Sequence, residues 1–138
     1  MRHALAAFFV FVFLVASGGC ASGPAPLVDG PVYPEGAALL GSLDIQVEIG
    51  EQEIVLSSGE AREFGPSTIW INRWYAAPVE GIPRGARLVV PLSSFMNEYG
   101  AAPRGAGFFA TRERDQIVLT EIETPEGIYG LRVVGSRD

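Results

Sequence analysis

The feature that most constrains the fold is a strict alternation of apolar and polar side chains along the chain. It is clearest in the run Leu43-Asp44-Ile45-Gln46-Val47-Glu48-Ile49, and a period of two is typical of a β-strand with one buried face. Further apolar or β-branched segments follow at residues 54–56, 68–75, 86–92, 107–111, 116–123 and 128–134. Glycine, proline and serine separate these segments, and no segment has the period of a long amphipathic helix. The sequence therefore predicts an all-β domain.

The number and spacing of these segments predict the architecture. Seven or eight short strands within residues 42–138 favour an antiparallel β-sandwich of immunoglobulin or fibronectin type, and a small barrel is the alternative. Pro91 lacks the backbone N–H that a central strand needs, so the strand at 86–92 is expected to lie at an edge or to end there. The clearest predicted pair is 116–123 with 128–134, joined by a turn at 124–127.

One stretch resembles a recurring element of bacterial immunoglobulin-like domains. Ile82-Pro83-Arg84-Gly85 precedes the apolar run 88–92, and Phe95 and the turn 98–100 follow. In such domains a glycine turn leads into a strand, and an aromatic residue and a second turn come next. The resemblance covers about twenty residues and implies the same sandwich fold.

The N-terminal residues 1–19 have the layout of a secretory signal. Arg2 precedes an uncharged stretch from Ala4 to Ala16, which would span about 20 Å as a helix and is shorter than the roughly 30 Å apolar core of a membrane. Small residues follow at 17–19. We expect a signal helix that is removed from the mature protein.

The residues around the cleavage point resemble the lipobox of bacterial lipoproteins. Gly18, Gly19 and Cys20 match that pattern, whereas Ser17 stands where the family usually has leucine. The resemblance implies that Cys20 receives a thioether-linked diacylglycerol and becomes an acylated N-terminus, which anchors the protein in a membrane of the bacterial cell envelope. Ala21, in place of aspartate, implies the outer membrane rather than the inner one, with the domain outside the cytoplasm. The alternative is a free thiol at Cys20.

Residues 20–41 are expected to connect the lipid to the domain. Prolines at positions 24, 26, 31 and 34 forbid a regular helix and favour an extended spacer. We interpret this segment as a lipidated cysteine and a flexible tether, rich in proline and glycine, whose last residues dock on the domain. The alternative is a flap packed through Val32, Tyr33 and Leu39.

The residue inventory excludes most catalytic chemistry. The chain has no lysine, and its only histidine and cysteine are His3 and Cys20. Beyond Cys20 it therefore lacks the imidazole base, the amine nucleophile and the common zinc, haem and iron–sulfur ligands. We predict a protein that is not an enzyme and has no cofactor and no metal. A formal charge of −6 argues against nucleic-acid binding.

Carboxylates are the catalytic groups that remain. Glu51 and Glu53, and likewise Glu121 and Glu123, are two residues apart, and each pair is expected to share one face of a strand. We interpret them as a solvated face, and a carboxylate-dependent hydrolase is the remote alternative.

An aromatic cluster at residues 70–75 holds the candidate contact residues. Trp70 and Trp74 would face the same side of one regular strand, and we interpret Trp70 as a core tryptophan. Trp74 and Tyr75, beside Arg73, are the predicted contact for a ligand or partner. Which of the two tryptophans is buried is left open.

These observations lead to two functional hypotheses. The first is a membrane-anchored envelope lipoprotein whose β-sandwich is a structural or protein-interaction module with another envelope protein as its partner. It predicts an exposed apolar patch or an open strand edge. The second is a carbohydrate- or peptidoglycan-binding module that uses Trp74 and Tyr75. It predicts coplanar exposed rings in a shallow groove.

Overall fold

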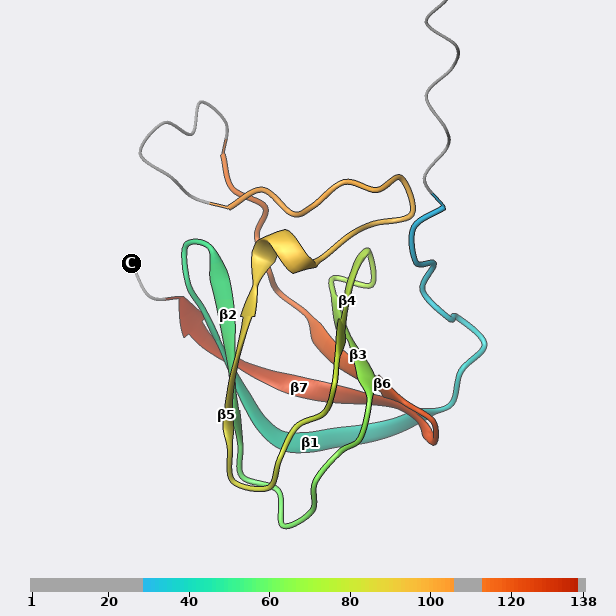
Figure 1. Cartoon of the computed structure of the whole chain (residues 1–138), viewed down its shortest axis with the longest axis vertical. Helices are drawn as coiled ribbons and strands as arrows, with labels where there is room; N and C mark the ends of the chain where they lie inside the picture. Colours follow the sequence, from blue (N-terminus) through green and yellow to red (C-terminus); the bar gives the residue numbers. More distant parts are fainter. Residues whose placement is uncertain (1–28, 106–112, 137–138) are drawn as a thin grey trace, which may run out of the picture.

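The computed structural model describes residues 29–105 and 113–136 (Figure 1). The predicted signal peptide, Cys20 and the strand predicted at 107–111 lie outside the described residues. Among the described residues, no helix has the length and apolar character needed to cross a membrane.

The described part of the chain is all-β, which confirms the predicted class. Its seven strands and one short 3₁₀ helix are β1 (Leu39–Ile49), β2 (Glu53–Ser58), β3 (Ser67–Ile71), β4 (Tyr75–Val79), β5 (Arg87–Pro91), η1 (Leu92–Ser94), β6 (Thr120–Thr124) and β7 (Gly127–Ser136).

The strands form one hydrogen-bonded sheet in the order β4-β3-β6-β7-β1-β2-β5. In Figure 1 the sheet is strongly curled, with β2 and β5 on one side of the long strands β1 and β7 and with β3 and β4 on the other. All neighbouring strands are antiparallel except β1 and β7, which run parallel. The prediction of a purely antiparallel arrangement is therefore wrong for this pair. Local periodicity carries no signal for it, because the pair joins the first strand to the last.

The alternation in β1 builds one side of the core, as its sequence predicts. Leu43, Ile45, Val47 and Ile49 are all buried, while the residues before Leu43 are exposed and pair with β7. The core also takes apolar side chains from β2, β3, β5, β6 and β7, including Ile54, Leu56, Ile69, Ile71, Val90, Ile122 and Leu131. The curled sheet thus encloses a single core.

The two edge strands both contain proline. β5 is one edge, which confirms the prediction made from Pro91, and β4 with Pro78 is the other. The β4 edge is partly covered, since Ala76 and Met96 exchange two backbone hydrogen bonds of 2.9 Å.

The prediction of one continuous strand over residues 68–75 is wrong. Asn72 and Arg73 have φ values of 52° and 57°, and the Trp74 N–H donates to the carbonyl of Ile71 at 3.0 Å. Two consecutive positive φ values define a type I′ turn, which joins β3 to β4 as a tight hairpin. Asparagine adopts this left-handed conformation more readily than most residues.

The predicted strand 116–123 is also shorter than expected, because β6 begins at Thr120. The preceding residues are held by Asn72 instead of β7. The Asn72 Nδ2 donates to the carbonyl of Gln116, and the Asn72 Oδ1 accepts hydrogen bonds from the N–H groups of Val118 and Leu119. The predicted pairing of this segment with the last strand is confirmed only from Thr120 onward.

Candidate functional site

Residues 30–38, here called the strap, lie across the outer face of the sheet before β1 begins. The Gly30 N–H donates to the carbonyl of Glu98 at 3.0 Å, and the Ile128 N–H donates to the carbonyl of Ala38 at 2.8 Å. A Cβ on Gly30 would overlap the carbonyl of Asn97, so only glycine fits there. The strap belongs to the segment that we interpreted as a tether. Among the three flap contacts considered, Tyr33 packs on the domain, whereas Val32 and Leu39 are exposed.

Trp70 is the buried tryptophan, but it does not lie in the core. Its neighbours Ile69 and Ile71 face the core, so Trp70 points to the outer face of β3. There it packs edge-on against Tyr33, and its Nε1 donates to Glu123 Oε2 at 2.8 Å. The interpreted burial of Trp70 is therefore confirmed, but the strap covers Trp70 on the outer face, apart from the main apolar cluster.

Glu121 and Glu123 share this outer face as expected, but they do not form a solvated face. Glu121 is only 4 % exposed and accepts two hydrogen bonds from Arg73, from Nε to Oε2 at 3.1 Å and from Nη2 to Oε1 at 2.9 Å. The Arg73 guanidinium also lies 5.3 Å from the centre of the Tyr33 ring. Both carboxylates thus take part in structural contacts, and Arg73 joins the β3–β4 turn to β6 and the strap.

A groove lined in part by Tyr33 and Arg73 is the first candidate site. It has a volume of about 450 Å³. Trp74 is 44 % exposed and lies at the groove, and its ring centre is 5.9 Å from that of Tyr99, which is 71 % exposed. The residues that line the groove are Pro31, Val32, Tyr33, Glu35, Arg73, Trp74 and Glu98.

The structure brings together two of the three predicted contact residues. Arg73 and Trp74 line the groove, whereas Tyr75 is half-buried against the core and donates from its hydroxyl to Asp115 Oδ2 at 3.0 Å. Tyr99, whose ring lies beside Trp74, was not predicted from the sequence as a contact residue. The Asn97 side chain positions it by accepting the N–H groups of Tyr99 and Ala101, and an asparagine two residues before an aromatic residue was the available signal.

Two ionisable groups near the candidate sites, Tyr99 and Asp115, have shifted pKa values. A hydrogen bond to the Glu98 carboxylate raises the pKa of Tyr99 above its usual range. The pKa of Asp115 is lowered, first by the hydrogen bond from the Arg104 N–H, and its burial partly opposes this shift. Each shift reflects a local contact and does not mark a proton-transfer pair.

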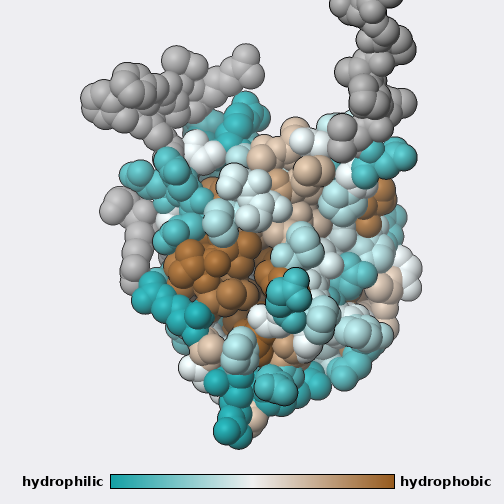
Figure 2. All heavy atoms as spheres, in the orientation of Figure 1, coloured by the Kyte–Doolittle hydropathy of each residue, from teal (hydrophilic) through white to brown (hydrophobic). Residues whose placement is uncertain are grey.

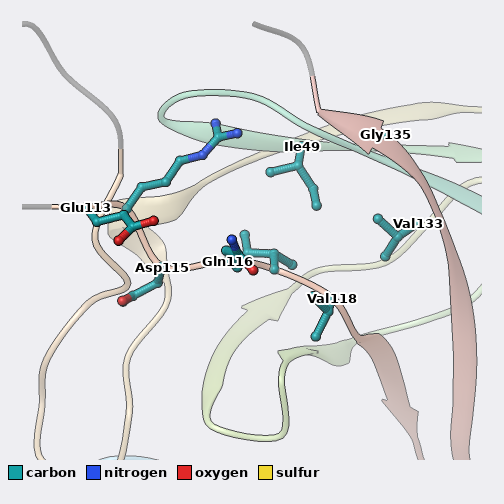
Figure 3. A pocket seen from close by; sticks show the side chains of 9 residues that line it. Ile49, Glu113, Asp115, Gln116, Val118, Val133 and Gly135 are labelled. Carbon is teal, nitrogen blue, oxygen red and sulfur yellow. The ribbon is translucent and has the colours of Figure 1, made fainter.

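A second hollow lies between the end of β7 and residues 113–118. Its volume is about 420 Å³. Figure 3 shows Ile49, Val118 and Val133 around it, where the chain before β6 diverges from β7. Glu113, Arg114, Asp115 and Gln116 add polar groups to the lining.

Part of the surface is hydrophobic. Figure 2 shows an apolar area over β2, β5 and β7, surrounded by hydrophilic side chains. Val89 and Val134 are the exposed large hydrophobic residues of these three strands.

Within residues 29–105 and 113–136, no three histidine, cysteine, aspartate or glutamate side chains come close enough to hold a metal ion. The chain matches no protein-family model, no curated protein and no solved structure.

Proposed function

We propose that this protein is a bacterial envelope lipoprotein, anchored through lipid on Cys20, whose β domain is a non-enzymatic interaction module outside the cytoplasm. The resemblance of Gly18-Gly19-Cys20 to a lipobox supports the anchor, and Ala21 supports the outer membrane. Eight residues separate Cys20 from Asp29, and they reach at most about 30 Å when fully extended. The domain would therefore work close to the membrane surface.

We propose further that the curled sheet is an immunoglobulin-type sandwich. The neighbours β1-β2-β5 correspond to strands A-B-E of that fold, and β3-β6-β7 correspond to C-F-G. β4 lies beside β3, at the position that variable-type domains give to C′. The parallel pair of β1 and β7 would join the two layers. The shared core, with Leu56 and Val90 from one group and Ile69 and Ile122 from the other, supports this assignment.

The observation that carries the interaction function is the pair of exposed rings at the groove. Trp74 and Tyr99 present large amphipathic surfaces to solvent, and such residues dominate the centres of protein interfaces. Trp74 follows a tight turn that the Arg73–Glu121 pair fixes to the sheet. A ring held in this way loses little conformational freedom on binding. The favoured partner is another envelope protein.

The anchor and the contact need separate tests. The variant Cys20→Ser is expected to remain unprocessed or to leave the membrane fraction, and it should not incorporate labelled palmitate. Normal processing and membrane retention of this variant would refute the anchor.

The contact is tested by photo-crosslinking in intact cells. A benzophenone amino acid at Tyr99 is expected to give a discrete crosslinked product that disappears in the Trp74→Ala background. The same probe at Val89, on a different strand, is the matched control. A product at Tyr99 that persists without the Trp74 ring would contradict a contact made through this groove.

The second candidate function is binding of carbohydrate or peptidoglycan, and the lining of the same groove favours it. Glu35, Glu98 and Arg73 supply polar groups beside Trp74, a combination that suits sugar hydroxyls and an apolar sugar face. The ring planes of Trp74 and Tyr99 meet at 53°, so a sugar would stack on one ring rather than on a flat pair. Trp74→Ala should then abolish retention on peptidoglycan or polysaccharide, and unchanged retention would rule out this candidate.

A further inference from the structure

The last part of β7 has an unpaired side. The pairing of β6 with β7 ends at Thr120 and Leu131, yet β7 continues to Ser136 beside β1. Across the described residues, no backbone hydrogen bond joins residues 113–119 to β7. Figure 3 shows this slot, with β7 along one side and the chain before β6 along the other.

Side chains hold the slot open at both of its ends. Near β6, the Asn72 amide makes three hydrogen bonds of 2.7 to 3.1 Å to the backbone of residues 116–119, and the Asn72 N–H donates to the carbonyl of Leu119 at 2.8 Å. Near the other end, Asp115 accepts hydrogen bonds from Tyr75 and from the Arg104 N–H. These contacts all draw residues 113–119 away from β7, so the gap is part of the folded architecture.

The walls of the slot suit an extended chain. Residues 132–136 pair with β1 on one side only, with a register shift between Val133 and Gly135. Alternate residues of a strand direct their N–H and C=O groups to opposite sides, so about half of these groups face the slot. Ile49, Ile117 and Val133 form an apolar floor continuous with the core, while Val118 is 74 % exposed at the rim.

The outer edges of the sheet are less suitable for an added strand. Pro91 ends β5, and Pro78 interrupts β4, which already pairs in part with Met96. Proline removes a ladder donor and is a common means of protecting an edge. The slot beside β7 offers the unpaired backbone groups of β7. Neither β7 nor residues 113–119 on the other side of the slot contain proline.

We propose that this slot binds an extended segment of a partner protein as an added β-strand between β7 and residues 116–119. Unpaired backbone donors and acceptors call for another backbone, and the apolar floor calls for apolar side chains at alternate positions. Glu113 and Asp115 outnumber Arg114 at the mouth, and the whole chain is acidic, so basic residues are expected to flank the bound segment. The slot is independent of the lipid anchor and of Trp74.

The test uses the mature protein in detergent and a fluorescent synthetic peptide in which valine alternates with threonine between terminal arginines. Fluorescence anisotropy measures binding, and hydrogen exchange measures protection of the amides of residues 132–136. A matched peptide with proline at its centre is the control, because it cannot complete the ladder. We expect the alternating peptide to bind and to slow exchange at 132–136, and the proline peptide to do neither.

Two exposed residues of similar character supply the variant controls. Val118→Arg places a positive charge at the rim of the slot, where it repels the arginines of the peptide, and should weaken peptide binding about tenfold or more. Val134→Arg places the same charge on β7 outside the slot lining and should leave binding within about twofold. Because both side chains are exposed, neither variant is expected to unfold the domain, and circular dichroism checks this.

Three binding results would overturn the proposal. They are equal binding of the proline peptide, unchanged binding by Val118→Arg, and no binding of the alternating peptide at millimolar concentration. Strong protection, in the free protein, of those amides of residues 132–136 that are not bonded to β1 would also overturn it, since the protein itself would then fill the slot. None of these results bears on the anchor or on the Trp74 contact, which are tested separately.

Discussion

Tyr33 packs edge-on against Trp70, with ring centres 5.2 Å apart and ring planes at 82°. This single contact joins the strap to the outer face of β3 and explains how a tryptophan outside the core is only 2 % exposed. It also fixes where the chain leaves the domain toward Cys20. The groove with Trp74 lies beside that exit, since Pro31 and Val32 line it.

Removal of the Tyr33 ring should expose Trp70. In a Trp74→Phe background, where Trp70 is the only tryptophan, Tyr33→Ala is expected to shift the fluorescence maximum to longer wavelength and to lower the free energy of unfolding by about 1–3 kcal/mol. Val32→Ala is the control, because Val32 is 70 % exposed and should change stability by less than about 0.5 kcal/mol. An unchanged emission spectrum in Tyr33→Ala would show that the strap does not cover Trp70.

Removal of the Arg73 guanidinium should leave the Glu121 carboxylate buried without its cation. We expect Arg73→Ala to lower the free energy of unfolding, but by less than the loss of the cation from a fully buried pair, because the Arg73 side chain is 47 % exposed. Glu121→Gln in the Arg73→Ala background should recover part of this loss, since it removes the uncompensated charge. Urea denaturation compares the single and the double variant with wild type. A double variant no more stable than Arg73→Ala alone would contradict this account of the pair.

The sequence anticipates the parts of the fold that depend on local periodicity and on proline. The alternation from Leu43 to Ile49 places the core face of β1 correctly, and Pro91 marks an edge strand correctly. Both signals act within a few residues, where the chemistry of one side chain decides the outcome.

The errors arise where a distant contact overrides the local pattern. Residues 68–75 look like one strand, but Asn72 and Arg73 turn the chain, and the Asn72 side chain bonds to residues 116–119, more than forty positions away. The face of Trp70 follows from the strap, whose prolines give no indication of where it docks. Asn97 could have indicated a turn at Tyr99, but the contact of Tyr99 with Trp74 joins residues 25 positions apart and has no local signal.

Asn72 adopts the left-handed conformation of the turn, and its side chain bonds to the backbone of residues 116–119. Two substitutions separate these two roles. Asn72→Gly keeps the positive φ of the type I′ turn and loses the amide contacts, so we expect a loss of about 1–2 kcal/mol in unfolding free energy. Asn72→Ala loses both and should cost about 1–2 kcal/mol more, because alanine is strained in the left-handed region. Hydrogen exchange at Val118 and Leu119 should accelerate in both variants. Slow exchange at these amides in Asn72→Gly would show that the amide does not hold the segment.

The stability of the domain should depend on pH through Asp115. Three contacts lower the pKa of Asp115 in the folded protein. The first is the hydrogen bond from the Arg104 N–H, and the others are the hydrogen bond from the Tyr75 hydroxyl and the charge of the Arg104 guanidinium. A lowered pKa means that the ionised form stabilises the folded state at pH above the ordinary value of about 3.9, and that this contribution is lost as the pH falls through the lowered value. Asp115→Asn should therefore reduce the free energy of unfolding by about 1–3 kcal/mol at pH 7, and the difference from wild type should shrink as the pH falls from about 5 to about 2.

Urea denaturation at a series of pH values measures this dependence. Asp44→Asn is the matched control. The Asp44 side chain is 60 % exposed, and its Oδ1 lies 3.9 Å from Arg132 Nη1. Its replacement should therefore change the free energy of unfolding by less than about 0.5 kcal/mol at any of these pH values. A constant difference between Asp115→Asn and wild type across the acid range would mean that the ionised carboxylate does not stabilise the fold. In that case the contacts of Asp115 with Tyr75 and Arg104 would act only as neutral hydrogen bonds, and the end of the slot that Asp115 fixes would be insensitive to acid.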